Sequence, residues 1–296
     1  MTSRVLVIGD VMTDIIVRPE GPIVTGSDRR AEIRHRPGGS GANQAVWLAA
    51  AGADVLFAAR VGAQDKPMYE NYFRGRGVVP VLTGDADLPS GVLVTLLDPG
   101  GERSFLTDRG ANLNLGAEGF PDDLFDDVGL VVVSGYSFFA PGPRAAVQAL
   151  LRAARAKGIA IGIDPASVGF LQEIGPELFR DWVGAASWLF ANESEAELLS
   201  GQADVDAQMR NLGQQFTHVV IKRGRLGAVL GDKGGIVHSL PAPIVDVMDT
   251  TGAGDAFAGG FIAALMDGEA LEKCLGQGIA AGGRAVQFVG GQPPGD

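Results

Sequence analysis

The sequence has 296 residues, 46% of them hydrophobic, and its 24 Lys and Arg against 35 Asp and Glu give a formal net charge of −11. A chain of this length can bury one large core, and one this acidic has no general attraction to nucleic acid or anionic lipid. Its one cysteine, Cys274, excludes intramolecular disulfides and cysteine-rich zinc sites. With no apolar run as long as a membrane span and acidic residues soon after Met1, we expect a cytoplasmic protein without nucleic-acid or membrane partners.

Short apolar runs alternate with helix-like stretches along most of the chain. The runs expected to form strands are Val5–Ile8, Val55–Ala59, Leu130–Val133, Ile159–Ile163, Trp188–Phe190, Val219–Ile221 and Ala228–Leu230. Most are too uniformly apolar to have a solvent-exposed face, which indicates a parallel sheet covered on both sides by helices such as Arg144–Lys157. The sequence therefore predicts a doubly wound, mostly parallel α/β fold, built as a single domain over residues 1–296.

Two segments interrupt this rhythm, at about residues 11–37 and 91–109, where polarity is mixed and turn residues recur. Glu32–Arg36 alternates like a half-exposed strand, and Asp98–Gly101 is expected to be a hairpin tip between strands Val92–Leu97 and Arg103–Leu106. These pieces predict a small antiparallel sheet that projects from the main body. Such a sheet could act as a lid over a ligand site, and could clasp a second copy in a homodimer.

The most informative stretch is the glycine-rich turn around Gly252-Ala253-Gly254-Asp255. Gly252 and Gly254 permit a tight turn, and the apolar residues that follow have helical spacing, so the turn opens a helix. Unpaired N–H groups and the helix dipole favour an anion there, such as a phosphate in transfer. Asp255 at the mouth of this hole could accept a proton from a hydroxyl, although an aspartate capping an ordinary helix is the alternative interpretation.

Three motifs together carry a family resemblance. The Asp249–Phe261 stretch resembles the C-terminal signature of the ribokinase-like (phosphofructokinase-B-type) carbohydrate and nucleoside kinases. Pro37–Ala45 resembles that family's N-terminal glycine-rich signature, and Asn192–Glu195 matches its Asn-x-x-Glu element. The matches occur in the family's order and span the whole chain. The resemblance implies an ATP-dependent carbohydrate kinase with a ribokinase-like fold, in which Asp255 is the base and Gly252, Ala253 and Gly254 shape the anion hole.

The resemblance also implies where the phosphoryl acceptor would bind. Gly38, Gly39 and Asn43 would line the sugar site, although Asn43 could instead cap a helix at Gln44–Ala51. Asp14, just after the first strand, is the expected ligand of substrate hydroxyls, with Asp10 as the local competitor. Arg109 beside the lid would suit an anionic or strongly polar substrate if it faces inward, and would otherwise be a solvated edge charge.

A second set of residues is expected to serve the nucleotide and its ions. Asn192 and Glu195 would organise Mg²⁺ and its waters, or simply begin a helix. Lys222 could reach a phosphate, while Gly224 and Gly227 would let ATP lie against the backbone; a solvated basic turn is the alternative for Lys222. Asp249 and Thr251 stand at positions where the family often binds a monovalent cation, so K⁺ is also expected.

The sequence leaves the identity of the phosphoryl acceptor open. The family's ribokinases carry a lysine where this chain has Ser40, and a mid-chain glutamate that Val133–Ser137 lacks, so ribose is a doubtful substrate. We expect transfer to a hydroxyl, preferably primary, of a small sugar or sugar derivative. The alternatives are a nucleoside kinase and a non-catalytic, sugar-responsive binding protein.

Overall fold

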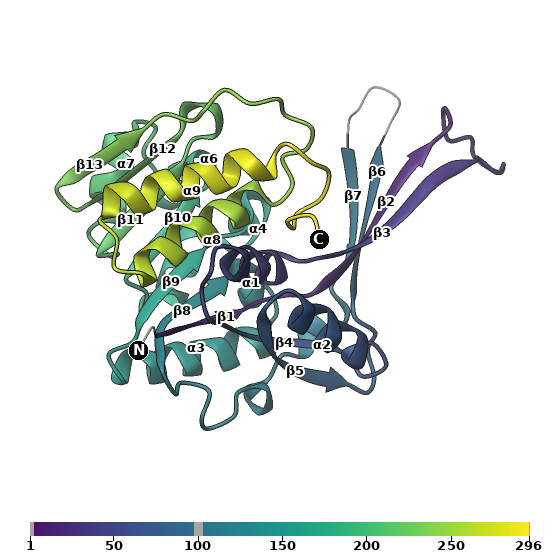
Figure 1. Cartoon of the computed structure of the whole chain (residues 1–296), viewed down its shortest axis with the longest axis horizontal. Coiled ribbons are helices and arrows are strands. Elements are labelled where there is room, and N and C mark those ends of the chain that lie inside the picture. Colours follow the sequence, from purple (N-terminus) through teal and green to yellow (C-terminus); the bar gives the residue numbers. More distant parts are fainter. Residues whose placement is uncertain (1–2, 98–102, 296) are drawn as a thin grey trace.

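The computed structural model describes residues 3–97 and 103–295, and it places most strands in one large sheet. In spatial order the strands of this sheet are β13 (Gly235–Leu240), β12 (Ala228–Asp232), β11 (His218–Lys222), β10 (Trp188–Asn192), β9 (Ala160–Asp164), β8 (Val128–Ser134), β1 (Arg4–Ile8), β4 (Val55–Gly62) and β5 (Val78–Asp85). In this spatial order, each pair of neighbouring strands between β11 and β5 is parallel. The expected doubly wound, mostly parallel α/β fold is confirmed (Figure 1).

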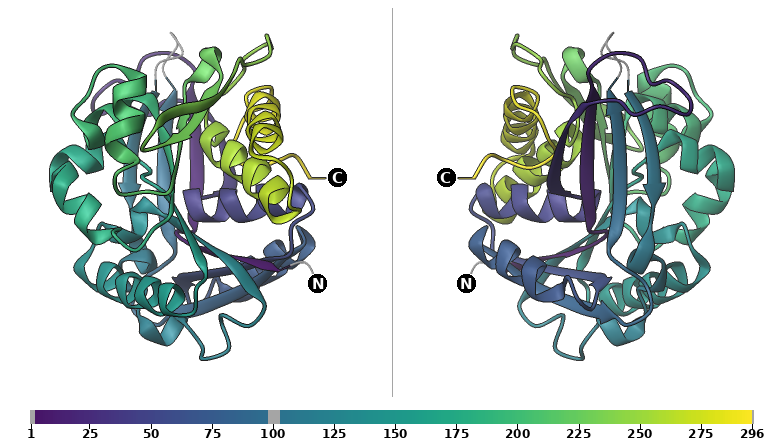
Figure 2. Two further views of the ribbon diagram at one scale, coloured as in Figure 1. Left: turned by 90° about the vertical axis from the view of Figure 1, so that its left-hand side faces the viewer. Right: turned by 90° about the vertical axis from the view of Figure 1, so that its right-hand side faces the viewer.

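Helices cover both faces of this sheet (Figure 2). One apolar cluster packs one face against helices α1 (Ser40–Ala50), α2 (Lys66–Gly75), α8 (Ala253–Met266) and α9 (Leu271–Ala285). A second packs the other face against α3 (Pro141–Ala156), α4 (Val168–Ile174), α5 (Pro176–Trp182), α6 (Glu193–Ser200) and α7 (Val205–Leu212). Burial on both faces explains why the inner strands are continuous apolar runs, since each fully buried Val, Leu or Ile contributes about 1.5–3 kcal/mol.

The edges of the large sheet differ from the sequence expectation. β12 and β13 run antiparallel to their neighbours, because only five residues join β11 to β12 and a parallel crossover needs a dozen or more. β5 and β13 were not expected as strands. Their buried and exposed residues are mixed along each strand, unlike the uniformly buried inner strands, so they lack the apolar run that marks those strands.

A second, smaller sheet projects from the body and is called the lid below. Its order is β3 (Ala31–Gly38), β2 (Met12–Pro19), β6 (Gly91–Leu97) and β7 (Arg103–Asp108). The sheet is mixed rather than purely antiparallel, because its central pair, β2 and β6, is parallel. Figures 1 and 2 show it standing beside the ends of the main strands. The hairpin tip expected at Asp98–Gly101 lies outside the described residues.

No helix in the described part of the chain is long and apolar enough to cross a bilayer. The helix that begins at Gln44 in the sequence expectation in fact begins at Ser40, with Gly39 as its N-cap. Asn43 therefore lies inside the first turn of α1, and the interpretation of Asn43 as a helix cap is wrong.

Candidate active site

A cavity of about 750 Å³ lies between the lid and the carboxyl ends of the main strands. Open α/β sheets bind ligands at this edge, where the loops after several strands converge. All the residues expected to form the site line the cavity except Gly38 and Asp249. These two support lining residues: a Cβ at Gly38 would overlap the Asp14 carboxylate, and Asp249 Oδ1 accepts hydrogen bonds from the Thr251 N–H at 2.9 Å and Oγ1 at 2.7 Å.

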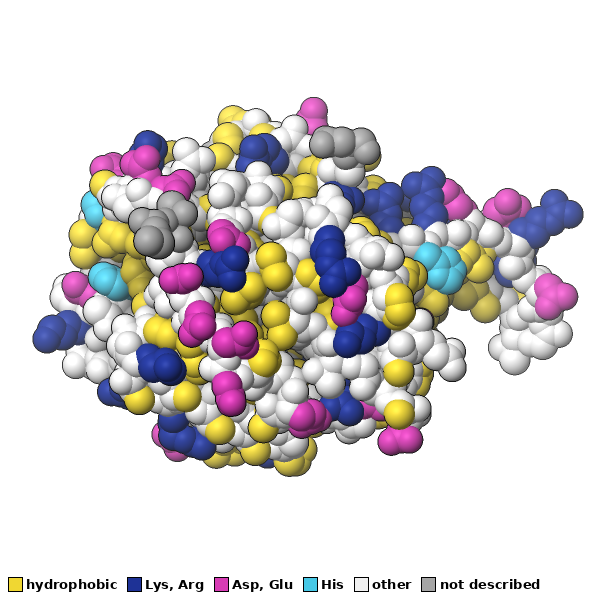
Figure 3. Space-filling model, turned by 60° about the horizontal axis from the view of Figure 1, so that its bottom comes forward, with side chains coloured by type: hydrophobic (Ala, Val, Ile, Leu, Met, Phe, Trp, Pro, Cys, Tyr) yellow, Lys and Arg dark blue, Asp and Glu magenta, His cyan; other side chains and the backbone are white. Residues whose placement is uncertain are grey.

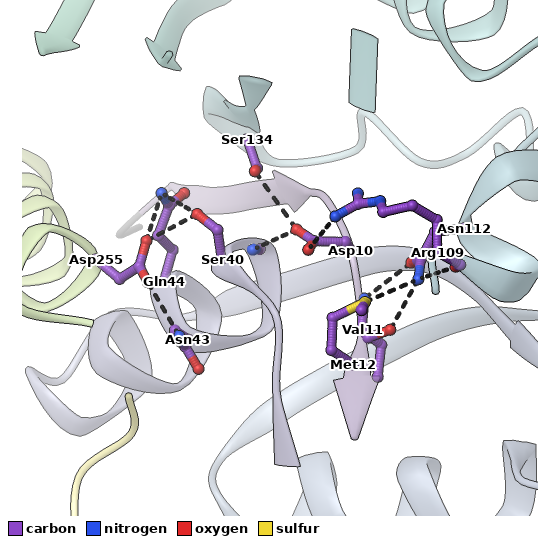
Figure 4. A network of polar contacts seen from close by, with 11 residues as sticks. Asp10, Val11, Met12, Ser40, Asn43, Gln44, Arg109, Asn112, Ser134 and Asp255 are labelled. Carbon is purple, nitrogen blue, oxygen red and sulfur yellow. Dashed lines mark hydrogen bonds and ion pairs between the residues drawn. The ribbon is translucent and has the colours of Figure 1, made fainter. Parts of the chain in front are cut away.

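Asp255 lies in the first turn of α8, beside the N-terminus of α1. Its Oδ1 accepts hydrogen bonds from Ser40 Oγ at 2.8 Å and Gln44 Nε2 at 3.1 Å, and its Oδ2 accepts one from Asn43 Nδ2 at 3.0 Å. Figure 4 shows these three side chains converging on the carboxylate. The network fixes the carboxylate at the cavity wall and joins the two glycine-rich signatures, which are more than 200 residues apart in the sequence.

Small residues make this meeting of helices possible. At Gly259, on the face of α8 against α1, a Cβ would lie 2.7 Å from Trp47 Cβ.

Gly252, the N-cap of α8, has φ of 72° in the left-handed region that glycine adopts without strain. A Cβ there would overlap the carbonyl of Gly291 in the C-terminal segment. That segment is held in turn by Trp47 Nε1, which donates to the Gly291 carbonyl at 2.9 Å.

The environment of Asp255 suits a proton acceptor. Burial raises the pKa of this carboxyl to about 7, with a further increase from the nearby Asp164 carboxylate. The hydrogen bonds from Asn43 and Ser40 and the charge of Lys222 act in the opposite direction but do not cancel the effect of burial. A base with a pKa close to neutral pH combines a useful ionised fraction with useful basicity.

The first turn of α8 offers backbone N–H groups to an anion. Those of the first turn have no intrahelical acceptor. Within the described residues, the Ala253 N–H has a turn partner, the Thr250 carbonyl at 3.3 Å, whereas those of Gly254 and Asp255 have none. Gly254 and Asp255 are therefore better placed than Ala253 to donate to a phosphate.

Lys222, at the end of β11, faces the same turn. Its Nζ lies 2.8 Å from Asp164 Oδ2 and 3.2 Å from the position a Cβ would take at Gly254. Burial lowers the pKa of Lys222, but the carboxylates of Asp164 and Glu195 outweigh burial and raise it, so the ammonium stays charged. The side chain is 12% exposed, which excludes the solvated-turn interpretation.

Asn192 and Glu195 form a reciprocal capping box at the start of α6. Asn192 Oδ1 accepts from the Glu195 N–H, and Glu195 Oε2 accepts from the Asn192 N–H, each at 2.8 Å. The helix-start interpretation is therefore correct, and both residues also line the cavity. Burial and the Asp164 carboxylate raise the pKa of Glu195. Asn192, Glu195 and Asp164 offer side-chain oxygen atoms, the ligand type that Mg²⁺ prefers, so these residues would suit that ion.

The lid side of the cavity contains Asp14, Asp10 and Arg109. Burial, followed by repulsion from Asp10, raises the pKa of Asp14 to about 7. Arg109 Nη1 lies 3.3 Å from Asp10 Oδ2, and its guanidinium carbon lies 4.7 Å from the centroid of the Tyr136 ring. Arg109 thus faces inward and is not a solvated edge charge. Asp10 and Asp14 both line the cavity, so the two local competitors belong to one site.

The opposite end of the cavity is apolar. Its wall includes Ala242, Pro243, Ile244, Val245, Val247, Ile279 and Val286. Ile244 is fully exposed and Val247 is 63% exposed, and exposed apolar side chains beside a cavity favour an apolar ligand group. This wall was not predicted from the sequence, and neither were Asp164, Ser40 and Gln44 as site residues. The sequence did contain a signal for Asp164, because this residue is the last of a buried parallel strand, at the end where open α/β sheets bind ligands.

The comparisons with known proteins agree with this site. The family model described as pfkB family carbohydrate kinase matches residues 2–295. The chain belongs to this family, and it is therefore an ATP-dependent sugar or nucleoside kinase.

The similar proteins include kinases of several acceptors. Aminoimidazole riboside kinase of Salmonella typhimurium is 32% identical, with 97% of this chain and 90% of that protein covered. Fructokinase of Klebsiella pneumoniae is 29% identical, covering 90% and 85%. Among solved structures, ribokinase of Thermotoga maritima superimposes with a TM-score of 0.81 at 27% identity, covering 98% of this chain and 95% of that one.

Proposed function

We propose that this kinase transfers the γ-phosphoryl group of ATP to a primary hydroxyl of a small sugar or glycoside, with Asp255 as the base. The observation that carries the proposal is the position of Asp255, held at the wall where the lid side of the cavity meets the N-terminus of α8. The acceptor would lie on the lid side, against Asp14, Gly39 and Asn43. The nucleotide would lie on the apolar side, with its phosphates directed at Lys222 and the turn.

The proposed reaction would use this arrangement in one step. A bond forms between the acceptor oxygen and the γ-phosphorus, the bond from phosphorus to the bridging oxygen breaks, and ADP leaves with that electron pair. The hydroxyl proton passes to Asp255 as the new bond forms, so a modest base is sufficient. The N–H groups of Gly254 and Asp255 and the Lys222 ammonium would stabilise the transferring group. The lid would exclude water, which is itself a competing acceptor.

Two further ligands belong to the proposal. Mg²⁺ bound with ATP would neutralise phosphate charge, and Asn192 and Glu195 would hold its waters. K⁺ would support the loop at Asp249 and Thr251, where Asp249 Oδ2 also accepts from the Gly290 N–H at 3.0 Å. We expect a higher kcat in K⁺ than in tetramethylammonium at equal ionic strength. Identical rates would contradict a role of K⁺ at this loop.

We also propose a homodimer through the lid. Asp14, Leu93 and Thr107 line the cavity, so strand alternation places Ile15, Val94 and Leu106 on the opposite face of the same sheet. Leu106 is 61% exposed. The lid projects from the body in Figure 3, which leaves this apolar face free to meet its copy about a two-fold axis.

The acceptor class is tested by ADP release from Mg-ATP with ribose, fructose, 2-keto-3-deoxygluconate, adenosine and pseudouridine. Rapid turnover with one or two of these compounds is expected, and the assay would name the acceptor. ATP binding without ADP formation in the presence of any of these acceptors would contradict the proposed reaction.

A further inference from the structure

The lid side of the cavity carries more acidic than basic side chains. The charged residues that line it are Asp10, Asp14 and Arg109, with Asp255 at the boundary. Among the described residues, two cations line the nucleotide side: Lys222 is paired with Asp164 and belongs to the phosphate position, and Arg225 lies in η4 (Gly224–Leu226), so neither is part of the lid side. Three carboxyl groups therefore face one guanidinium where the acceptor would bind.

That guanidinium is already committed. Arg109 Nη1 lies 3.3 Å from Asp10 Oδ2, and the group packs over two rings, 4.7 Å from Tyr136 and 5.7 Å from Phe139. Its side chain is only 17% exposed. Figure 4 shows Arg109 reaching to Asp10, which lies between Arg109 and Asp255. An incoming anion would have to compete with Asp10 for a cation held in place by packing.

Asp10 is fixed just as firmly. It is 3% exposed, and its Oδ1 accepts from the Gly41 N–H at 3.2 Å and from Ser134 Oγ at 3.5 Å. Gly41 belongs to the first turn of α1, so Asp10 is tied to the same helix end that positions Asp255. The carboxylate cannot swing aside to release Arg109 without giving up these bonds.

Asp14, the third charged residue of the lid side, has a hydrogen-bond acceptor atom without a donor. Its Oδ1 is buried and has no hydrogen-bond partner within the described structure. The carboxylate lies against Gly38, where any side chain would collide with it, so it is confined to the cavity wall. A buried acceptor without a partner is costly. Once the Asp14 carboxyl is ionised, a hydroxyl or amino group of a ligand would satisfy its Oδ1, whereas an anionic group would be repelled.

We propose that this site selects an uncharged, hydroxyl-bearing acceptor, a free sugar, polyol or nucleoside, and rejects sugar phosphates and sugar acids. Asp10 is the positioning residue for this selectivity, because it neutralises the cation that would otherwise attract an anion. The inference rests on the proposed kinase reaction and narrows its acceptor class.

Matched acceptor pairs test the inference on the unmodified protein. Each pair shares its primary hydroxyl and differs in charge: fructose and fructose 1-phosphate, sorbitol and gluconate, adenosine and adenosine 3′-phosphate. We expect kcat/KM for the neutral member of the active pair to exceed that of the anionic member about 100-fold, since like charges at close range are poorly screened in a cavity. Preference for an anionic acceptor would overturn the inference while leaving the kinase reaction intact. Silence with every pair would contradict the reaction as well.

The Asp10→Asn variant separates charge selection from a purely structural role. Its amide oxygen can still accept from Gly41 and Ser134, but Arg109 loses its counter-ion. The neutral-to-anionic ratio of kcat/KM should therefore fall at least 10-fold. Asp54→Asn is the control, since Asp54 forms an exposed pair with Arg4 at 3.0 Å and should leave the ratio unchanged. Equal losses for both acceptors in Asp10→Asn would mean that Asp10 only supports the fold, and would contradict the proposal.

Discussion

The Asp255 carboxylate interacts with two helices, α8 and α1. It is an acidic residue in the first turn of α8, where the dipole favours negative charge, and it is the acceptor for three side chains of α1. The donors hold the carboxylate in one orientation, while burial keeps its proton affinity high. Orientation and basicity thus come from different neighbours.

The raised pKa of Asp255 predicts the pH dependence of catalysis. The base works only when ionised, so kcat/KM should fall as pH decreases through about 7, and should level off above it. Asp14, also raised to about 7, is expected to steepen this limb. The measurement is kcat/KM between pH 5.5 and 9, with circular dichroism at each pH to show that the fold persists. A flat profile from pH 5.5 to 7.5 would contradict the assignment.

The turn before α8 and the C-terminal segment form one structural element at the site. Gly290 donates to Asp249, Gly291 accepts from Trp47, and Gly291 packs against Gly252. The Arg36 guanidinium on the lid strand β3 also donates to the carbonyl of Val289. The segment therefore contacts the lid, α1 and the anion hole together.

Gly252→Ala should destabilise the protein more than a glycine substitution with the same backbone geometry. Gly268 has a similar φ of 77° but nothing within 4 Å of an added Cβ, so Gly268→Ala measures backbone strain alone, about 1–2 kcal/mol. The overlap with Gly291 should add about 1–3 kcal/mol in Gly252→Ala. Urea unfolding of both variants gives the difference. Equal free energies of unfolding would show that the segment yields freely and is not a support of the turn.

The strands that could be predicted from the sequence are those that are buried on both faces. The inner strands were identifiable because burial on both faces imposes an unbroken apolar run, whereas β5 and β13 at the edges carry no such signal. Glycine motifs located the turn and Asp255. The pairs Ser40–Asp255 and Lys222–Asp164 could not be foreseen, because they join residues 215 and 58 positions apart and depend on how helices and strands pack. The inward direction of Arg109 depended likewise on the rings of η3 (Gly135–Phe138) and Phe139.

The two faces of the lid sheet have different surroundings. One face closes the cavity with Asp14, Leu93 and Thr107, and the other exposes apolar side chains. A dimer would cover this second face and restrain the lid from outside. Formation of the dimer and closure over the acceptor would then depend on the same four strands.

The dimer prediction has a direct test in solution. Light scattering coupled to size-exclusion chromatography should give twice the chain mass of 30.6 kDa, about 61 kDa. Leu106→Asp should give the monomer, because a charge in the centre of an apolar interface is poorly paired. Leu178→Asp is the matched control, on helix α5 away from the lid and 46% exposed. A monomeric unmodified protein would contradict the prediction.

The role of Asp255 as the base is tested by comparing Asp255→Asn with Asp267→Asn on the acceptor that gives the highest turnover. Both changes remove one carboxylate from α8, at its first turn and at its exposed C-cap. If Asp255 is the base, kcat falls at least about 100-fold in Asp255→Asn, ATP affinity stays within a few-fold, and Asp267→Asn retains full activity. Full activity in a folded Asp255→Asn would contradict the mechanism.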